Sequence, residues 1–203
     1  TDYKPVRRLL AEQAEMFGDK PYMVSIDQDE KILSYRNLHR LGNRMAHYFQ
    51  ERGLKANDRV LMLSENSAEF LAVFLGVQRY GATVATANVE MNRAHIAEII
   101  SAVAPKFLLV QEGIGLEELQ GHAGDAEWMS LGEWNEDGGS TGFFAAIEDY
   151  PDTDDVAEIC QPDDIAVIFY TSGTESKPKG VLQAHSAIWP NYDATADAVG
   201  MTA

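Results

Sequence analysis

Residues 60–87 read VLMLSENSAEFLAVFLGVQRYGATVATA, and this stretch decides the predicted fold. Residues 60–63 and 83–87 are short apolar runs, which are typical of buried strands. Residues 66–80 lie between them, and their apolar side chains recur with the spacing of a core-facing helix. A strand, a helix and a second strand in this order predict two parallel strands joined by a crossover helix.

The two ends of this helix carry their own signals. Asn66 and Glu69 have the spacing of a capping box, which places the predicted start of the helix at Asn66. Gly81 follows the last helical residue and suits the left-handed conformation that commonly ends a helix.

The same kind of pattern extends along the chain in both directions. The further predicted elements are a helix at residues 6–17, a hairpin with strands at 22–26 and 32–35, a helix at 38–52, a helix at 93–103, and strands at 107–110 and 165–170. The alternation of strands and helices predicts an α/β fold with a largely parallel sheet flanked by helices. The unbroken apolar run at 165–170 predicts a strand covered on both faces.

Composition narrows the class of protein. The 203 residues include 32 acidic and 16 basic ones, for a net charge of −16. Nucleic acids and anionic lipids bind proteins through Lys and Arg, so this charge disfavours both as partners. No apolar run approaches the roughly 20 residues of a membrane span. The single cysteine, Cys160, and the lack of a signal segment predict a cytoplasmic protein, and a homo-oligomer is left open.

The acidic residues gather in one part of the chain. Residues 112–164 contain 16 acids and no Lys or Arg, together with two glycine clusters. This segment is expected to be a loop-rich, solvated surface, with a cation-binding or basic-partner surface as the less favoured alternative. Its aromatic residues are expected to form a small satellite cluster: Trp128, Trp134, Phe143 and Phe144.

The sequence YTSGTESKPKG at residues 170–180 follows the apolar run and is the strongest candidate for chemistry. Open α/β sheets bind ligands at the carboxyl ends of their strands, which is where this loop is expected. Hydroxyl groups, a flexible glycine and the charge of Lys177 or Lys179 suit a polyphosphate. The segment is not a Walker loop, because its lysine precedes its glycine. A solvated β-hairpin is the alternative interpretation.

Other candidate residues have weaker support. The five histidines show no metal-ligand spacing with one another or with Cys160: His39, His47, His95, His122 and His185. Cys160 is expected to be an inert, partly buried thiol. A packing or helix-start role is expected for His185, with contact to a substrate as the alternative.

The loop resembles the signature YTSGTTGxPKG of the adenylate-forming superfamily, from which it departs at Glu175 and Ser176. Four more segments resemble that family in the expected order: residues 33–38, 53–60, 75–82 and 164–170. In the second of them Asn57 stands where the family pattern has glycine. The chain is therefore identified as similar to this family over nearly its whole length, and most like an acyl-CoA synthetase.

The resemblance implies a fold, an activity and a binding site. Family members use ATP and Mg²⁺ to convert a carboxylic acid into an acyl adenylate and pyrophosphate, and most then form a thioester with a thiol such as CoA. The residues that it implies for binding the ATP phosphates are Thr171, Ser172, Gly173, Thr174, Glu175, Ser176, Lys177, Lys179 and Gly180. An amino-acid adenylation domain and a luciferase-like enzyme remain alternatives, as does a non-catalytic nucleotide-binding or regulatory protein.

The resemblance also implies an organisation. Residues 1–203 are expected to be an incomplete N-terminal part of the large domain of an adenylate-forming enzyme. Its expected parts are an α/β portion at 1–111, the acidic segment at 112–164, and the strand and phosphate-binding loop at 165–203. The C-terminal domain with its catalytic lysine is expected beyond Ala203, so the fragment by itself is expected to be inactive, with no catalytic residue of its own.

Overall fold

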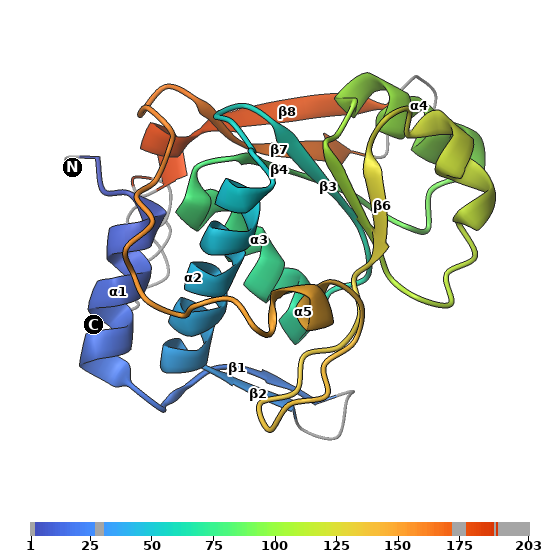
Figure 1. The fold of residues 1–203 in the computed structure, drawn as a ribbon. Helices are drawn as coiled ribbons and strands as arrows, with labels where there is room; N and C mark the ends of the chain where they lie inside the picture. The colour runs from blue at the N-terminus through green and yellow to red at the C-terminus, as the bar shows by residue number, and fades with distance from the viewer. Residues whose placement is uncertain (1–2, 27–30, 172–177, 189, 191–203) are drawn as a thin grey trace.

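The computed structural model describes residues 3–26, 31–171, 178–188 and 190. Figure 1 shows a six-stranded sheet in the order β6-β5-β3-β4-β7-β8, in which all neighbours are parallel except β7 and β8. Its strands are β3 (Arg59–Leu63), β4 (Thr83–Ala87), β5 (Phe107–Val110), β6 (Glu127–Ser130), β7 (Ile165–Thr171) and β8 (Lys179–Ala184). A separate antiparallel hairpin consists of β1 (Pro21–Ser25) and β2 (Lys31–Ser34).

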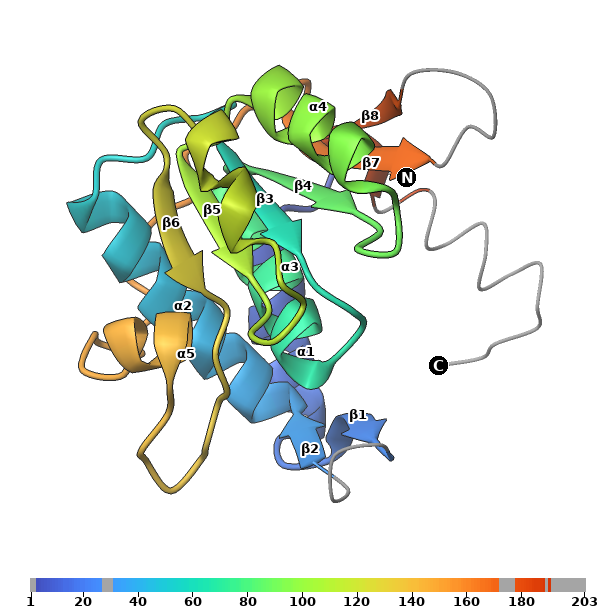
Figure 2. The same ribbon diagram turned by 90° about the vertical axis from the view of Figure 1, so that its right-hand side faces the viewer.

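Helices cover both faces of the sheet (Figures 1 and 2). One face is covered by α2 (Tyr35–Glu51), α3 (Ala68–Tyr80) and α5 (Gly142–Ile147), with α1 (Val6–Phe17) packed on α2 and α3. The other face is covered by α4 (Arg93–Val103) and the 3₁₀ helix η1 (Glu117–His122).

Successive side chains of the central strands enter two different cores. Val60 and Met62 of β3 pack with the α2–α3 side, whereas Leu61 and Leu63 pack with the α4 side. All four side chains are fully buried. This two-sided burial explains why the strand is continuously apolar, and it confirms the predicted parallel α/β fold.

The structure corrects the expectation for the acidic segment. Residues 112–164 contain η1, β6 and α5, and β6 pairs in parallel with β5. Trp134, Phe143 and Phe144 are buried in the main core instead of a satellite cluster, and Phe143 stacks on Phe49. Of the 16 acidic residues, eleven are exposed and five are half-buried, so a high charge in the sequence did not mean an absence of core.

The structure also corrects the start of α3. Ser67 is the N-cap, and its hydroxyl oxygen accepts a hydrogen bond from the backbone N–H of Phe70 at 3.0 Å. Glu69 does not close a capping box. Its carboxylate is buried and accepts hydrogen bonds from Lys31 Nζ and from the backbone N–H of Trp134. Gly81 ends the helix with a φ of 96°, as predicted.

The corrected cap gives a direct test. Ser67→Ala should lower the free energy of unfolding by about 1 kcal/mol, because it leaves an N–H of the first turn without its acceptor. Asn66→Ala is the matched control and should change stability far less. Urea unfolding of both variants measures the difference, and a larger loss in Asn66→Ala would contradict the assignment of Ser67 as the cap.

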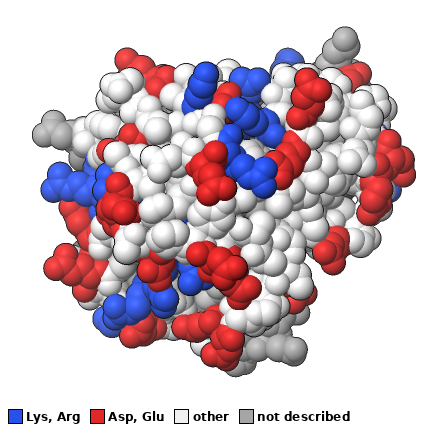
Figure 3. Space-filling model, viewed as in Figure 1, with Lys and Arg blue, Asp and Glu red and all other residues white. Residues whose placement is uncertain are grey.

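Acidic and basic side chains lie close to one another on the surface. Figure 3 shows Lys and Arg side chains lying beside Asp and Glu on one face of the molecule. Ion pairs such as Arg52–Glu127 at 3.1 Å and Arg40–Asp152 at 2.6 Å join segments far apart in sequence. Among the described residues, no helix is both long and apolar enough to cross a membrane.

Candidate phosphate-binding site

The candidate loop connects the two strands of a β-hairpin. β7 runs parallel to β4, with Val84 opposite Val167, so its carboxyl end lies at the same sheet edge as the ends of β3, β4 and β5. β8 returns antiparallel beside β7 as the outermost strand. The segment is thus a β-hairpin, as in the alternative interpretation. Its turn lies between the end of β7 and the start of β8, at the carboxyl ends of the parallel strands, where α/β sheets bind ligands.

The predicted phosphate-binding residues are placed in part. Thr171 is the last residue of β7, and its backbone lies opposite Lys179, the first residue of β8. Gly180 follows on β8. The remaining six lie outside the described residues: Ser172, Gly173, Thr174, Glu175, Ser176 and Lys177.

The described part of the hairpin fits a polyphosphate ligand. Lys179 is exposed, and among the described residues no hydrogen bond or ion pair is made by its side chain. A Cβ at Gly180 would lie 3.1 Å from Ile168 Cγ2 and 3.2 Å from Tyr170 Cζ. This close approach favours glycine, because a Cβ there would require the side chains of Ile168 and Tyr170 to shift.

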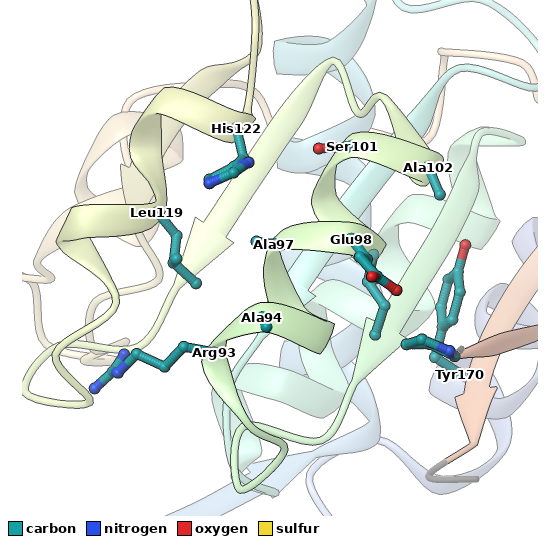
Figure 4. Close-up of a pocket in the computed structure, with 11 residues that line it drawn as sticks. Arg93, Ala94, Ala97, Glu98, Ser101, Ala102, Leu119, His122 and Tyr170 are labelled. Carbon is teal, nitrogen blue, oxygen red and sulfur yellow. The ribbon is translucent and has the colours of Figure 1, made fainter. Parts of the chain in front are cut away.

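A large open hollow lies beside the hairpin. Its volume is about 810 Å³, and its lining comes from α4, η1, Tyr170 and Pro178. Figure 4 shows Tyr170 on one side of α4, and Leu119 and His122 on the other. The guanidinium of Arg93 in this lining is already paired with Glu118 at 3.0 Å. The hollow therefore provides open surface beside Tyr170. The positive charge of Arg93 is already paired with Glu118, so it is not left for a phosphate. Desolvation raises the pKa of Tyr170, which keeps its hydroxyl neutral.

A second cavity, of about 350 Å³, lies between the carboxyl ends of β3 and β4. It is lined in part by Ser64, Asn66, Phe70 and Asn88. The chain leaves β3 toward α3 on one face and leaves β4 toward α4 on the other, which makes this a topological switch point of the sheet. Sequence reasoning missed these residues, although polar side chains directly after two neighbouring strands were the available signal.

His185 follows β8 and is 2% exposed. Its backbone N–H donates to the carbonyl oxygen of Asp164 at 3.0 Å, and its buried Nε2 has no hydrogen-bond partner among the residues that the structure describes. Burial lowers the pKa of the imidazole, which disfavours its charged form. This burial agrees with the packing role expected for His185.

The lowered pKa of His185 predicts a pH dependence of stability. The folded-state pKa lies below the ordinary value of 6.5, so between the two the unfolded chain binds more protons than the folded one. The free energy of unfolding should therefore fall as the pH falls below about 6.5, and burial of His39 acts in the same direction. In His185→Gln the loss between about pH 7.5 and about pH 5.5 should be smaller than in the wild type. Urea unfolding at both pH values measures it, and equal losses would contradict the prediction.

Cys160 is buried, and its thiol lies 3.8 Å from the hydroxyl of Tyr3. Burial raises the pKa of the thiol, which disfavours the reactive thiolate, as expected for an inert cysteine. Within the described parts of the chain, no group of three or more His, Cys, Asp or Glu side chains is placed to hold a metal ion.

The fold is a mostly parallel α/β sheet, and β7 ends and β8 begins at the carboxyl ends of its parallel strands, where sheets of this class bind ligands. A family model described as AMP-binding enzyme matches residues 10–202. The chain belongs to this family, which confirms the resemblance to adenylate-forming enzymes.

Individual relatives agree with this assignment. The chain is 29% identical over 189 residues to Tyrocidine synthase 1 of Brevibacillus parabrevis, covering 91% of this chain and 16% of the relative. It is 26% identical over 187 residues to 4-coumarate-CoA ligase 1 of Narcissus pseudonarcissus, covering 92% of this chain and 34% of the relative. The chain thus spans 16% and 34% of the length of these two proteins.

A solved structure shows the same fold. The anthranilate CoA ligase AuaEII in complex with anthranoyl-AMP superposes with a TM-score of 0.80 at 23% identity. The match covers 96% of this chain and 36% of that protein.

Proposed function

We propose that this chain is part of an ATP-dependent carboxylate-CoA ligase, which activates a carboxylic acid as an acyl adenylate and then forms an acyl-CoA thioester. The observation that carries the proposal is the exposed Lys179, the first residue of β8, at the carboxyl ends of the parallel strands in an AMP-binding family member. The 4-coumarate-CoA ligase relative supports the thioester-forming part. A fatty acid is the substrate class to test first.

The chemistry explains why such a loop is needed. A carboxylate oxygen attacks the α-phosphorus of ATP, and the bond from that phosphorus to the bridging oxygen breaks to release pyrophosphate. Negative charge on the leaving β- and γ-phosphates must be stabilised by cations and hydrogen-bond donors. Lys179 supplies a cation, while Thr171, Ser172, Thr174 and Ser176 supply hydroxyl donors, with Glu175 and Lys177 beside them.

Glycine residues allow the loop to follow the phosphates closely. Gly173 lets backbone N–H groups approach phosphate oxygens, and Gly180 lets β8 start against Tyr170 and Ile168. Mg²⁺, when bound, neutralises part of the phosphate charge. Because the chain spans 34% of the ligase relative, the complete reaction is proposed for the full-length protein and not for residues 1–203 alone.

Acid-dependent exchange of labelled pyrophosphate into ATP by the full-length protein tests the proposal. Fatty, aromatic and amino acids are compared at equal concentration, and thioester formation with CoA is then measured for the best acid. Exchange driven by a fatty or aromatic acid and followed by acyl-CoA formation would support the ligase. Absence of exchange with every acid would contradict adenylation and favour a non-catalytic nucleotide-binding protein.

An amino-acid adenylation domain is the second candidate. It is favoured by the synthase relative, Tyrocidine synthase 1, which is similar over 91% of this chain. Exchange that responds to an amino acid, without transfer to CoA, would support this candidate over the ligase.

A further inference from the structure

Asn57 departs from the family pattern, which has glycine at this position, and it adopts the left-handed conformation with a φ of 65°. Asparagine tolerates this region better than most residues. Its side chain makes two hydrogen bonds to the start of β7. Asn57 Nδ2 donates to Asp164 Oδ1 at 2.7 Å, and Asn57 Oδ1 accepts from the backbone N–H of Ile165 at 3.0 Å. The residue that replaces glycine thus keeps the required backbone conformation and adds contacts that glycine cannot make.

More hydrogen bonds converge on the same point from other strands. Thr83 at the start of β4 donates its hydroxyl proton to the carbonyl oxygen of Ile165 at 2.6 Å. The end of β8 is tied in as well, because the N–H of His185 donates to the carbonyl oxygen of Asp164 at 3.0 Å. The base of the β7–β8 hairpin is therefore fixed to the turn before β3 and to β4.

Strand β7 contains an irregularity directly after these hydrogen bonds. Ile165 is opposite Ala184 and Val167 is opposite Gln183, so β7 has one more residue than β8 at Ala166. Ala166 and Val167 accordingly pack in the same core, whereas Ile165 and Ile168 pack in the other. The extra residue breaks the alternation of side chains along β7.

The position of this bulge decides which face every later side chain of β7 occupies. Without it, the residues from Val167 to Tyr170 would exchange faces, because side chains alternate with a period of two. The apolar run cannot select the position by itself, since Ala166, Val167 and Ile168 are all buried. The hydrogen bonds to the backbone of Ile165 supply the information that selects the position of the bulge.

We propose that Asn57, acting with Asp164 and Thr83, is a positioning residue that fixes the bulge of β7 and so the placement of the β7–β8 hairpin, which carries Lys179 at the start of β8. This inference rests on the proposed function for its effect on ATP, but not for its effect on the hairpin.

The test compares Asn57→Gly with the wild type in the full-length protein. Glycine keeps the left-handed conformation without strain, so the variant removes the two side-chain hydrogen bonds and little else. Asn135→Gly is the matched control, because Asn135 is also exposed but lies in the loop between β6 and α5. The amide exchange rates of Ile165 and His185 are measured by NMR, and ATP-binding stoichiometry is measured by calorimetry.

In Asn57→Gly, exchange at Ile165 and His185 should be about fivefold faster, which corresponds to the loss of about one net hydrogen bond. Exchange in β3 and β5 should not change. The fraction of molecules that bind ATP should also fall, which a purely stabilising role would not produce. The double variant with Thr83→Val should increase both effects.

Unchanged exchange at the hairpin base, or an equal increase throughout the sheet, would overturn the proposal. Faster local exchange with full ATP stoichiometry would overturn the link to the phosphate-binding loop. If the wild type itself binds no ATP, the proposed function fails, and the exchange rates still decide whether Asn57 fixes the hairpin.

Discussion

Lys179→Ala in the full-length protein should slow acid-dependent pyrophosphate exchange by about 100-fold to 1,000-fold, the loss typical of removing one group that stabilises transition-state charge. Lys179 is exposed at the carboxyl edge of the sheet, opposite the end of β7. Its charge does not serve the fold through any ion pair with the described residues, so the variant should retain the stability of the wild type.

Two further variants test whether the expected loss of pyrophosphate exchange is specific to Lys179. Lys179→Arg keeps the charge but changes its geometry, and it should retain more activity than alanine. Lys55→Ala removes another exposed lysine, in the turn before β3 at the opposite edge of the sheet, and should have no comparable effect. Equal exchange rates in Lys179→Ala and the wild type would exclude Lys179 from phosphate binding.

Arg79→Met should lower the free energy of unfolding by about 2–6 kcal/mol, because two buried acceptors lose their donor at about 1–3 kcal/mol each. Arg79 of α3 has no exposed surface. Its guanidinium donates to Asn43 Oδ1 at 3.0 Å, to the carbonyl oxygen of Val156 at 2.7 Å and to Asp154 Oδ1. Burial lowers the pKa of Arg79, while the adjacent carboxylate of Asp154 favours its charged form.

The large effect is expected because one side chain satisfies three acceptors from distant parts of the chain. Methionine fills similar space but leaves the amide oxygen of Asn43 and the carbonyl of Val156 without this donor. Arg8→Met on the exposed surface of α1 is the control, because the Arg8–Glu12 pair is solvent-exposed and should contribute at most about 0.5 kcal/mol. Urea unfolding measures both variants. Similar losses in the two would show that the buried network is not stabilising.

The candidate site was only partly accessible to sequence reasoning. The loop after β7 was identified from its composition and its place after an apolar strand. The position of this hairpin in the sheet depends on the pairing of β7 with β4. The paired residues are far apart in sequence, as Val84 and Val167 are. The cavity at the ends of β3 and β4 likewise requires two strands to meet, and no local pattern describes that.

The sequence by itself determined the elements whose signals are local. Residues 60–63 and 107–110 are apolar because both faces of each strand are buried, and Gly81 marks a helix end because it adopts positive φ. The tertiary structure decided what depends on distant partners. β6 was missed because it is short, polar and only half-buried, and it becomes a strand by pairing with β5. The burial of Phe143 and the hydrogen bond between Asn57 and Ile165 also depend on distant partners. Contacts between residues far apart in sequence form only when the chain folds, so no local pattern reports them.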